Sequence, residues 1–104
     1  MEKYRLSLLA FDDLDGIFDY TYEKWGAEQA HHYGDLVKKA VTELVEDPMR
    51  PTSKNRDDLL EGCRFYRVQH HYLFYRVKND LVEIGRILHE QMNFEDHLTE
   101  EVFQ

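Results

Sequence analysis

The residues best suited to chemistry are arginines, a histidine and a carboxylate in the second half of the chain. Arg64, Arg76, Arg86 and His89 fall on or beside three predicted strands, and Glu83 lies among them. Arginines with one histidine can hold a phosphodiester and transfer a proton, because guanidinium groups stabilise developing negative charge and imidazole exchanges protons near neutral pH. Arginines on an exposed sheet face also commonly pair with acids or bind a partner. The pattern therefore leaves an acid–base site and a binding surface open.

The other reactive side chains favour no catalytic or metal site. The six histidines have no HExxH spacing, and adjacent histidines cannot face one ligand together, so we expect solvated or structural roles. Cys63 is the only cysteine, which excludes an internal disulfide, and no nearby residue marks a base for it. No phosphate-binding glycine loop occurs. We therefore expect neither a metal nor a cofactor.

Tyrosines interleave with the arginines in this region. Such a pattern can stack on bases and contact phosphates, or receive a partner peptide. The formal net charge of −8 repels a polyanion at long range and favours the peptide. The residues concerned are Tyr66, Tyr72 and Tyr75 with Arg64, Arg67 and Arg76.

Hydrophobic periodicity predicts the elements that position these residues. A short edge strand is expected at residues 4–6, followed by a helix that Ser7 caps and that ends at Gly26. A second helix begins near Ala27 or Glu28 and ends before Pro48. The two helices predict an antiparallel hairpin. Residues 48–62 are expected to form a long loop, with a helical turn around 57–60.

From Arg64 the period changes to two, which predicts strands at residues 64–68, 72–77 and 81–88. The middle strand is apolar on both faces and should be central in the sheet. Gly85 predicts a bulge that lets Arg86 leave the face carrying Val82 and Ile84. A short terminal helix is expected after Asn93, with contacts from Phe94, Leu98, Val102 and Phe103.

The order β-α-α-β-β-β predicts an α+β fold, with the helical hairpin packed across a small, mostly antiparallel sheet. The 104 residues suit one domain spanning 1–104, because half this length would not support its own core. The side chains expected between the hairpin and the sheet are Phe18, Trp25, Val37 and Leu44 on the helices and Val68, Leu73 and Ile84 on the strands.

Composition limits the location and partners of the chain. No apolar run approaches the ~20 residues of a membrane span, and no signal peptide is evident, so we expect a cytoplasmic protein. Residues 54–86 carry seven basic and five acidic side chains, a net of +2, whereas residues 1–53 and 87–104 are each at −5. An anionic partner should dock on the middle third.

In this order the residues resemble the ParE branch of the ParE/RelE toxin superfamily, over residues 4–98. Each segment is short, but together and in sequence they are specific. The matching residues are Tyr4-Arg5-Leu6-Ser7, Ala10, Asp13-Leu14 and Ile17; Tyr20, Trp25-Gly26, Gln29-Ala30 and Tyr33; Arg56-Asp57, Leu59, Gly62 and Arg64; Phe74-Tyr75-Arg76-Val77; and Ile87-Leu88-His89, Met92 and His97-Leu98.

The resemblance implies a RelE-like fold and the toxin of a type II toxin–antitoxin system. It implies inhibition of DNA gyrase, neutralisation by a ParD-like antitoxin, and no catalytic residues. The related RelE branch implies an alternative, a ribosome-dependent mRNA endoribonuclease, for which Arg64, Arg86 and His89 would be the catalytic candidates. A third possibility is a module that binds the antitoxin but has lost toxicity.

Two sets of contact residues follow. The antitoxin should bind the exposed edge strand, helix side chains outside the core, and the basic middle third; sequence-specific nucleic-acid binding is not expected. For the antitoxin these residues are Tyr4, Arg5, Leu6, Leu9, Tyr22, Tyr33, Arg56, Arg64, Arg67 and Arg76, and for the target Arg86, His89 and Met92.

Overall fold

The computed structural model describes residues 3–103 and confirms the predicted element order. The elements are β1 (Tyr4–Leu6), α1 (Leu8–Trp25), α2 (Ala27–Glu46), β2 (Lys54–Asn55), β3 (Arg64–Val68), β4 (His71–Lys78) and β5 (Leu81–His89), followed by the 3-10 turns η1 (Phe94–Asp96) and η2 (Glu100–Phe103). Two details differ from the prediction. The long loop contains the two-residue strand β2, and the tail forms two 3-10 turns in place of a regular helix.

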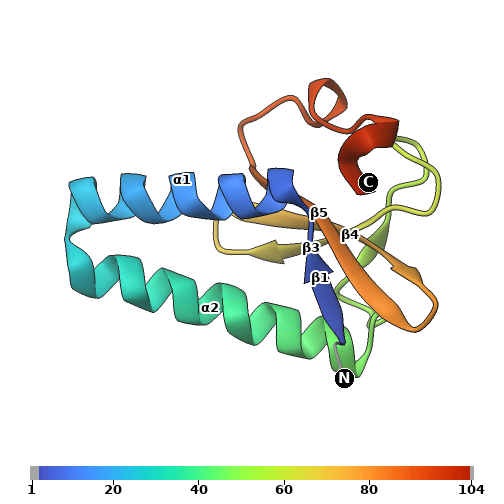
Figure 1. The fold of residues 1–104 in the computed structure, drawn as a ribbon, viewed down its shortest axis with the longest axis horizontal. Coiled ribbons are helices and arrows are strands. Elements are labelled where there is room, and N and C mark those ends of the chain that lie inside the picture. Colours follow the sequence, from blue (N-terminus) through green and yellow to red (C-terminus); the bar gives the residue numbers. More distant parts are fainter. Residues whose placement is uncertain (1–2, 104) are drawn as a thin grey trace.

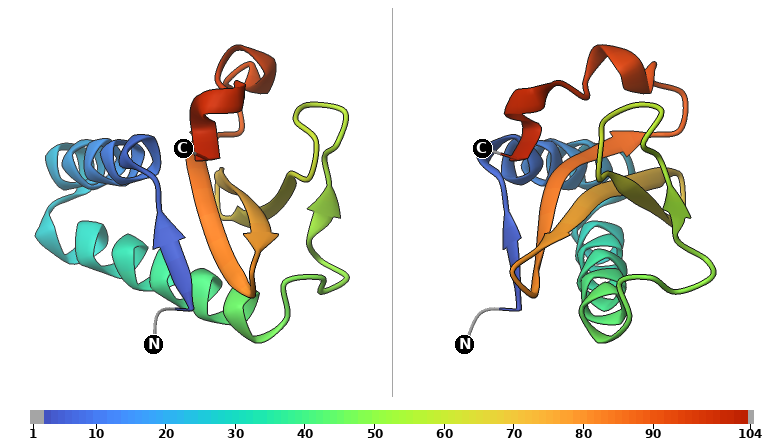
Figure 2. Two further views of the ribbon diagram at one scale, coloured as in Figure 1. Left: turned by 45° about the vertical axis from the view of Figure 1, so that its right-hand side comes forward. Right: turned by 90° about the vertical axis from the view of Figure 1, so that its right-hand side faces the viewer.

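The five strands form one mixed sheet in the order β1-β5-β4-β3-β2. β1 pairs parallel to β5, and the other neighbours are antiparallel. The sheet therefore has β4 at its centre and β1 at an edge, as predicted. The helical hairpin covers one face and extends well beyond the sheet (Figure 1). Figure 2 shows α2 and the C-terminal tail on opposite sides of the sheet.

The predicted bulge in β5 is confirmed at Gly85. Phe74 pairs with Arg86, whereas the next residue, Tyr75, pairs with Ile84, so Gly85 is the extra residue. One inserted residue reverses the alternation of side chains. Arg86 consequently lies on the face opposite Ile84.

The N-terminus of α1 is fixed to this bulge. The Ser7 hydroxyl accepts a hydrogen bond from the Ala10 amide at 3.0 Å, which caps the helix, and donates one to the carbonyl of Gly85 at 2.7 Å. The Ser7 amide also donates to the carbonyl of Ile84 at 2.9 Å. At the other end, Gly26 has a φ of 91°, which L residues rarely adopt, and this allows the direct turn into α2.

The core between the hairpin and the sheet contains most of the predicted residues. Val37, Leu44, Val68, Leu73 and Ile84 are all buried there, as expected. The expected burial of Trp25 is wrong. Its side chain is 70% exposed, because α1 continues past the end of the sheet and no strand lies beneath its last turn. Phe18 is half-buried and packs edge-on against His31 of α2, at 5.6 Å between ring centroids, away from the sheet.

A second core lies under the tail. Leu98, Val102 and Phe103 pack on the opposite face of the sheet with Cys63, Phe74 and Leu88, and Phe94 packs against the margin of this cluster. The expected contacts of the tail are therefore confirmed. No helix within residues 3–103 has the length and apolar character needed to cross a membrane.

Candidate functional site

A groove of about 1090 Å³ opens where the helical hairpin extends beyond the sheet. The β3–β4 turn and the end of β5 complete the wall of this groove beside the two helices. Its lining comprises Asp12, Asp13, Gly16, Ile17, Tyr20, Thr21 and Trp25 from α1; Gln29, His32, Tyr33 and Leu36 from α2; and Gln69, His70, His71, Ile87, His89, Gln91 and Met92 from the sheet and its loops.

Large apolar side chains in this groove remain open to solvent. Trp25 is 70% exposed, Tyr20 60% and Met92 37%. Ile87 and Tyr33 form its floor, where they also contact the main core. Exposed aromatic and Met side chains around a concave surface are typical of a protein-binding site.

Three imidazoles gather at the sheet end of the groove. The His89 ring lies 6.3 Å from that of His70, with which it stacks, and 5.0 Å from that of His71, which it meets edge-on. The backbone amide of Gln91 donates to Nδ1 of His89 at 3.1 Å. In neutral His89 this leaves the proton on Nε2. Because His71 opens β4 directly opposite His89 in β5, the strand register itself brings these rings together.

His71 is held by Tyr33 of α2. The Tyr33 hydroxyl hydrogen-bonds with Nδ1 of His71 and lies 3.1 Å from the carbonyl oxygen of Val68. Burial, reinforced by the imidazoles of His89 and His70, lowers the pKa of His71 to about 4. Burial and the negative charge of Glu90 raise the pKa of Tyr33 to about 12. Both groups are therefore uncharged at neutral pH.

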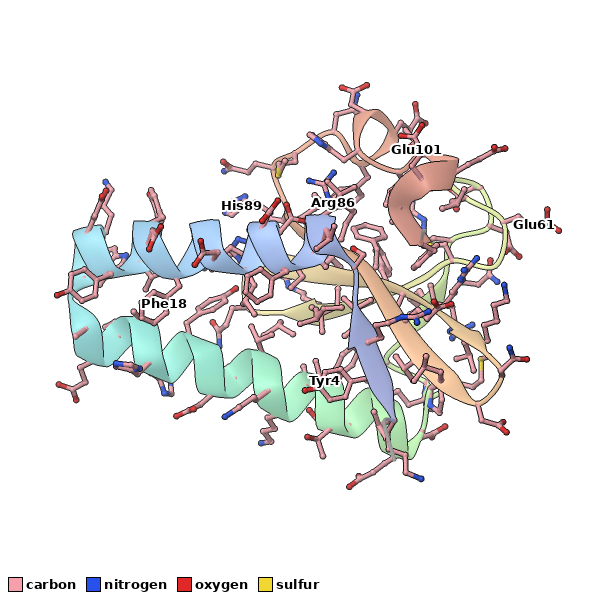
Figure 3. All side chains as sticks on the ribbon, in the orientation of Figure 1. Tyr4, Phe18, Glu61, Arg86, His89 and Glu101 are labelled. Atoms are coloured by element: carbon pink, nitrogen blue, oxygen red, sulfur yellow. The ribbon has the colours of Figure 1, made fainter. Side chains whose placement is uncertain are left out.

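Arg86 is held by an acid of α1. Asp13 accepts hydrogen bonds from Nε and Nη2 of Arg86 at 2.8 and 2.9 Å and from the backbone amide of Ile87 at 3.0 Å. Both charged side chains are only 15% exposed. Figure 3 shows Arg86 beside the first turns of α1, consistent with a bridge between helix and sheet.

The structure does not bring the three nuclease candidates together. Arg64 lies on the helix-covered face of β3, opposite Tyr75, where its Nε donates to the Ser53 hydroxyl at 3.0 Å. The bulge places Arg86 on the other face, whereas His89 returns to the groove side opposite His71. The three side chains therefore point to different surfaces.

The remaining predicted arginines do not form one basic surface. Arg56 pairs with Asp58 through two hydrogen bonds of 3.0 Å, and Arg67 pairs with Glu90 at 3.0 Å. The other arginines follow the same pattern. Arg76 binds Glu83 at 2.8 Å and lies over the Phe103 ring, 4.7 Å from its centroid, and Arg5 binds the same carboxylate. Partners within the chain thus already occupy each guanidinium.

The residues predicted from β1 and the helices lie on other surfaces. Tyr4 is 45% exposed on the edge strand, and Leu9 is 41% exposed near the start of α1. Tyr22 stacks with Phe18 on the flank of α1 that the groove does not include. The helical spacing puts two further exposed side chains, Leu8 and Phe11, on this flank.

The groove combines the two predicted contact sets. Tyr33, expected to bind the antitoxin, and His89 and Met92, expected to bind the target, line the same walls. The contributions of His32, Gln29 and Tyr20 were missed, because they depend on how far the hairpin extends past the sheet. Within residues 3–103, no three His, Cys, Asp or Glu side chains are arranged to hold a metal ion.

Comparison with known proteins identifies the family. Residues 4–94 match the family described as the ParE toxin of the type II toxin–antitoxin system, parDE. The chain is 38% identical to toxin ParE1 of Caulobacter vibrioides over 98 residues, covering 94% of this chain and 99% of that protein. It is 31% identical to toxin ParE1 of Mycobacterium tuberculosis over 97 residues, covering 92% and 97% of the two chains.

Solved structures show the same fold. A chain of the chromosomal ParDE toxin–antitoxin system of P. aeruginosa superposes with a TM-score of 0.72 at 23% identity, over 86% of this chain and 96% of that one. A chain of the RelBE2 toxin–antitoxin complex of Mycobacterium tuberculosis superposes with a TM-score of 0.62 at 22% identity, over 85% and 96%. The fold is therefore RelE-like, and the sequence match shows that this chain belongs to the ParE toxin family of type II toxin–antitoxin systems.

Proposed function

We propose that this chain acts in the cytoplasm as a toxin that inhibits DNA gyrase, and that a ParD-like antitoxin neutralises it by forming a hetero-oligomer. The observation that carries the proposal is the apolar surface left open on the helical hairpin of a ParE-family chain. Leu8 is 84% exposed, Phe11 59% and Trp25 70%. So much exposed apolar surface on a small domain favours a partner that covers it.

The antitoxin has three surfaces available. One is the groove, another is the outer flank of α1 that carries Tyr22, and the third is the free edge of β1. An edge strand of three residues can accept one more strand through its unpaired backbone groups. Among the arginines, Arg5 and Arg67 are the most accessible to an acidic antitoxin segment, with side chains 60% and 57% exposed.

Target contact is assigned to the mouth of the groove. Met92 is 37% exposed there, beside half-buried His89. Arg86 has a different role, since Asp13 holds its guanidinium in place between α1 and β5. An antitoxin segment in the groove would cover His89 and Met92, which accounts for neutralisation by direct competition.

The endoribonuclease alternative has less support. Arg64, Arg86 and His89 point to different surfaces, and the tail packs over the sheet face that carries Arg76 and Arg86. That tail also accepts hydrogen bonds from both residues, from Arg86 at the His97 carbonyl and from Arg76 at the Phe103 carbonyl. A messenger RNA would have to displace it.

Purified chain should be tested for accumulation of cleaved gyrase–DNA complexes and for loss of supercoiling, in parallel with mRNA cleavage on ribosomes. We expect cleaved gyrase–DNA complexes to accumulate and supercoiling to be lost, and we expect no mRNA cleavage. The ParD-like antitoxin should abolish both effects on gyrase. Met92→Glu should weaken the effect on gyrase, whereas the control Met49→Glu, at a methionine that lies outside the groove and is 62% exposed against 37% for Met92, should not. Ribosome-dependent mRNA cleavage without any effect on gyrase would overturn the proposal.

A further inference from the structure

The groove lacks a permanent positive charge. Among residues 3–103, none of the side chains that line the groove is Lys or Arg, so its four histidines are the only ones there that can become cationic. Imidazole is the side chain whose charge ordinarily changes between pH 5 and 8. The charge that a partner meets in this groove therefore depends on pH.

The geometry distinguishes the four histidines. His71 is half-buried and uncharged at neutral pH, and Tyr33 hydrogen-bonds to its Nδ1. His70 is exposed at the β3–β4 turn, His32 is exposed on α2, and His89 stands between His70 and His71 at the end of β5. Because its Nδ1 accepts from the backbone, His89 has Nε2–H available as a donor to a ligand.

Of the acidic residues that face these imidazoles, Asp13 and Glu90 form ion pairs within the chain, and Asp12 is the exception. On α1, Asp13 is bound by Arg86, and Asp12 lies on the groove wall. At the rim, Glu90 pairs with Arg67 and with Nδ1 of His70 at 3.1 Å, and the hydrogen bond from His70 lowers the pKa of that carboxyl. In the part of the chain that the structure describes, no carboxylate hydrogen-bonds to His89. Its Nε2–H can therefore donate to a carboxylate of a partner.

We propose that the groove binds an amphipathic segment of the antitoxin that places its apolar residues against Tyr20, Trp25 and Met92 and a carboxylate against His89 and His70. Binding then takes up a proton and tightens as the pH falls. An anion in a partly desolvated site favours the protonated imidazole, and the proton in turn strengthens the ion pair. The chain as a whole carries −8, so this local cation is what offsets repulsion of an acidic segment at this site.

This inference rests on the proposed antitoxin partnership. We choose a carboxylate over an uncharged partner group for two reasons. It accepts hydrogen bonds from the imidazole N–H groups, and its negative charge is attracted to an imidazole that becomes protonated. Uptake of one proton on binding changes the dissociation constant tenfold for each pH unit over which it operates. If it operates over about one unit between pH 8 and pH 6, the dissociation constant should fall about tenfold at constant ionic strength.

The test is isothermal titration calorimetry of this chain with a ParD-like antitoxin, at pH 6, 7 and 8. Two buffers of different protonation enthalpy at pH 7 give the number of protons taken up. The variants are His89→Gln and His70→Gln. The control is His31→Gln, because His31 packs on Phe18 and does not line the groove. Urea unfolding of every variant checks that each remains folded.

Wild type and His31→Gln should show the tenfold change and proton uptake, and His89→Gln should lose most of both. A dissociation constant independent of pH would overturn the inference. A pH dependence that both groove variants retain would also overturn it, by assigning the titration to the antitoxin. Absence of binding at every pH is a different result, which refutes the proposed partnership itself.

Discussion

The ion pair between Asp13 and Arg86 should be one of the larger single contributions to stability. Asp13→Ala removes three hydrogen bonds, leaves a guanidinium that is 15% exposed without its counter-ion, and leaves the amide of Ile87 without its acceptor. Breaking a buried pair in this way costs about 3–5 kcal/mol. A domain of this size has about 5–15 kcal/mol in total. The variant should therefore be close to unfolding at 37 °C.

A double-mutant cycle separates the pair from its surroundings. Arg86→Met should cost about 3 kcal/mol, somewhat less than Asp13→Ala, because the remaining carboxylate still accepts from the Ile87 amide. The double variant should cost about 2 kcal/mol less than the sum of the two single variants. Urea unfolding at a slope of about 1.5 kcal/mol per molar would show midpoint shifts of about 2–3 M for the single variants.

A matched control exists in the same chain. Arg56 and Asp58 form the same bidentate ion pair through Nε and Nη2 of the arginine. However, the Asp58 side chain is 63% exposed, and the two residues are only two positions apart in the sequence. Its cycle should give a far smaller coupling than the Asp13–Arg86 pair, because solvent screens the exposed charges. If the Asp13–Arg86 coupling were equally small, Arg86 would not be a bridge between α1 and β5. It would again become a candidate for direct contact with a target.

Three other predictions follow from particular contacts. A Cβ on Gly85 would meet the Val102 side chain at 2.2 Å and the Phe103 ring at 2.8 Å, so Gly85→Ala should lower the free energy of unfolding by about 1–3 kcal/mol, and this effect should disappear in a chain that ends at residue 99. The pKa of His71 falls from 6.5 unfolded to about 4 folded, so the unfolded state binds more protons and stability should decrease from pH 6.5 toward pH 4. His71→Gln should flatten that part of the pH profile of urea unfolding, and an unchanged profile would refute the assignment. Leu44→Ala should cost about 2–5 kcal/mol, since its side chain is fully buried, and an unchanged urea midpoint would contradict the described core.

The sequence predicted the fold where the physical signal was local. The period of 3.6 defined the two helices, Ser7 and Gly26 marked the ends of α1, and alternation defined the three long strands. The position of Gly85 within an alternating run was enough to predict the bulge. These features depend on neighbouring residues alone, so no tertiary information was needed.

The site was harder to predict because its contacts are distant in sequence. Asp13 and Arg86 are 73 residues apart, and Tyr33 and His71 are 38 apart. Helical period placed Trp25 on the same face as buried residues, but period does not show where the underlying sheet ends. The exposure of Trp25 and the groove beside it have this common origin.

The bulge explains why residues that are close in sequence serve different surfaces. In a regular β5, Arg86 would share a face with Ile84 and would enter the main core, whereas Ile87 and His89 would face the tail. The extra residue at Gly85 reverses this pattern: Ile87 joins the core, His89 reaches the groove, and Arg86 meets Asp13. Arg86 and His89 are only three residues apart, yet the first supports the fold and the second faces the proposed partner. A functional site assigned from their proximity in sequence therefore groups residues that the strand geometry separates.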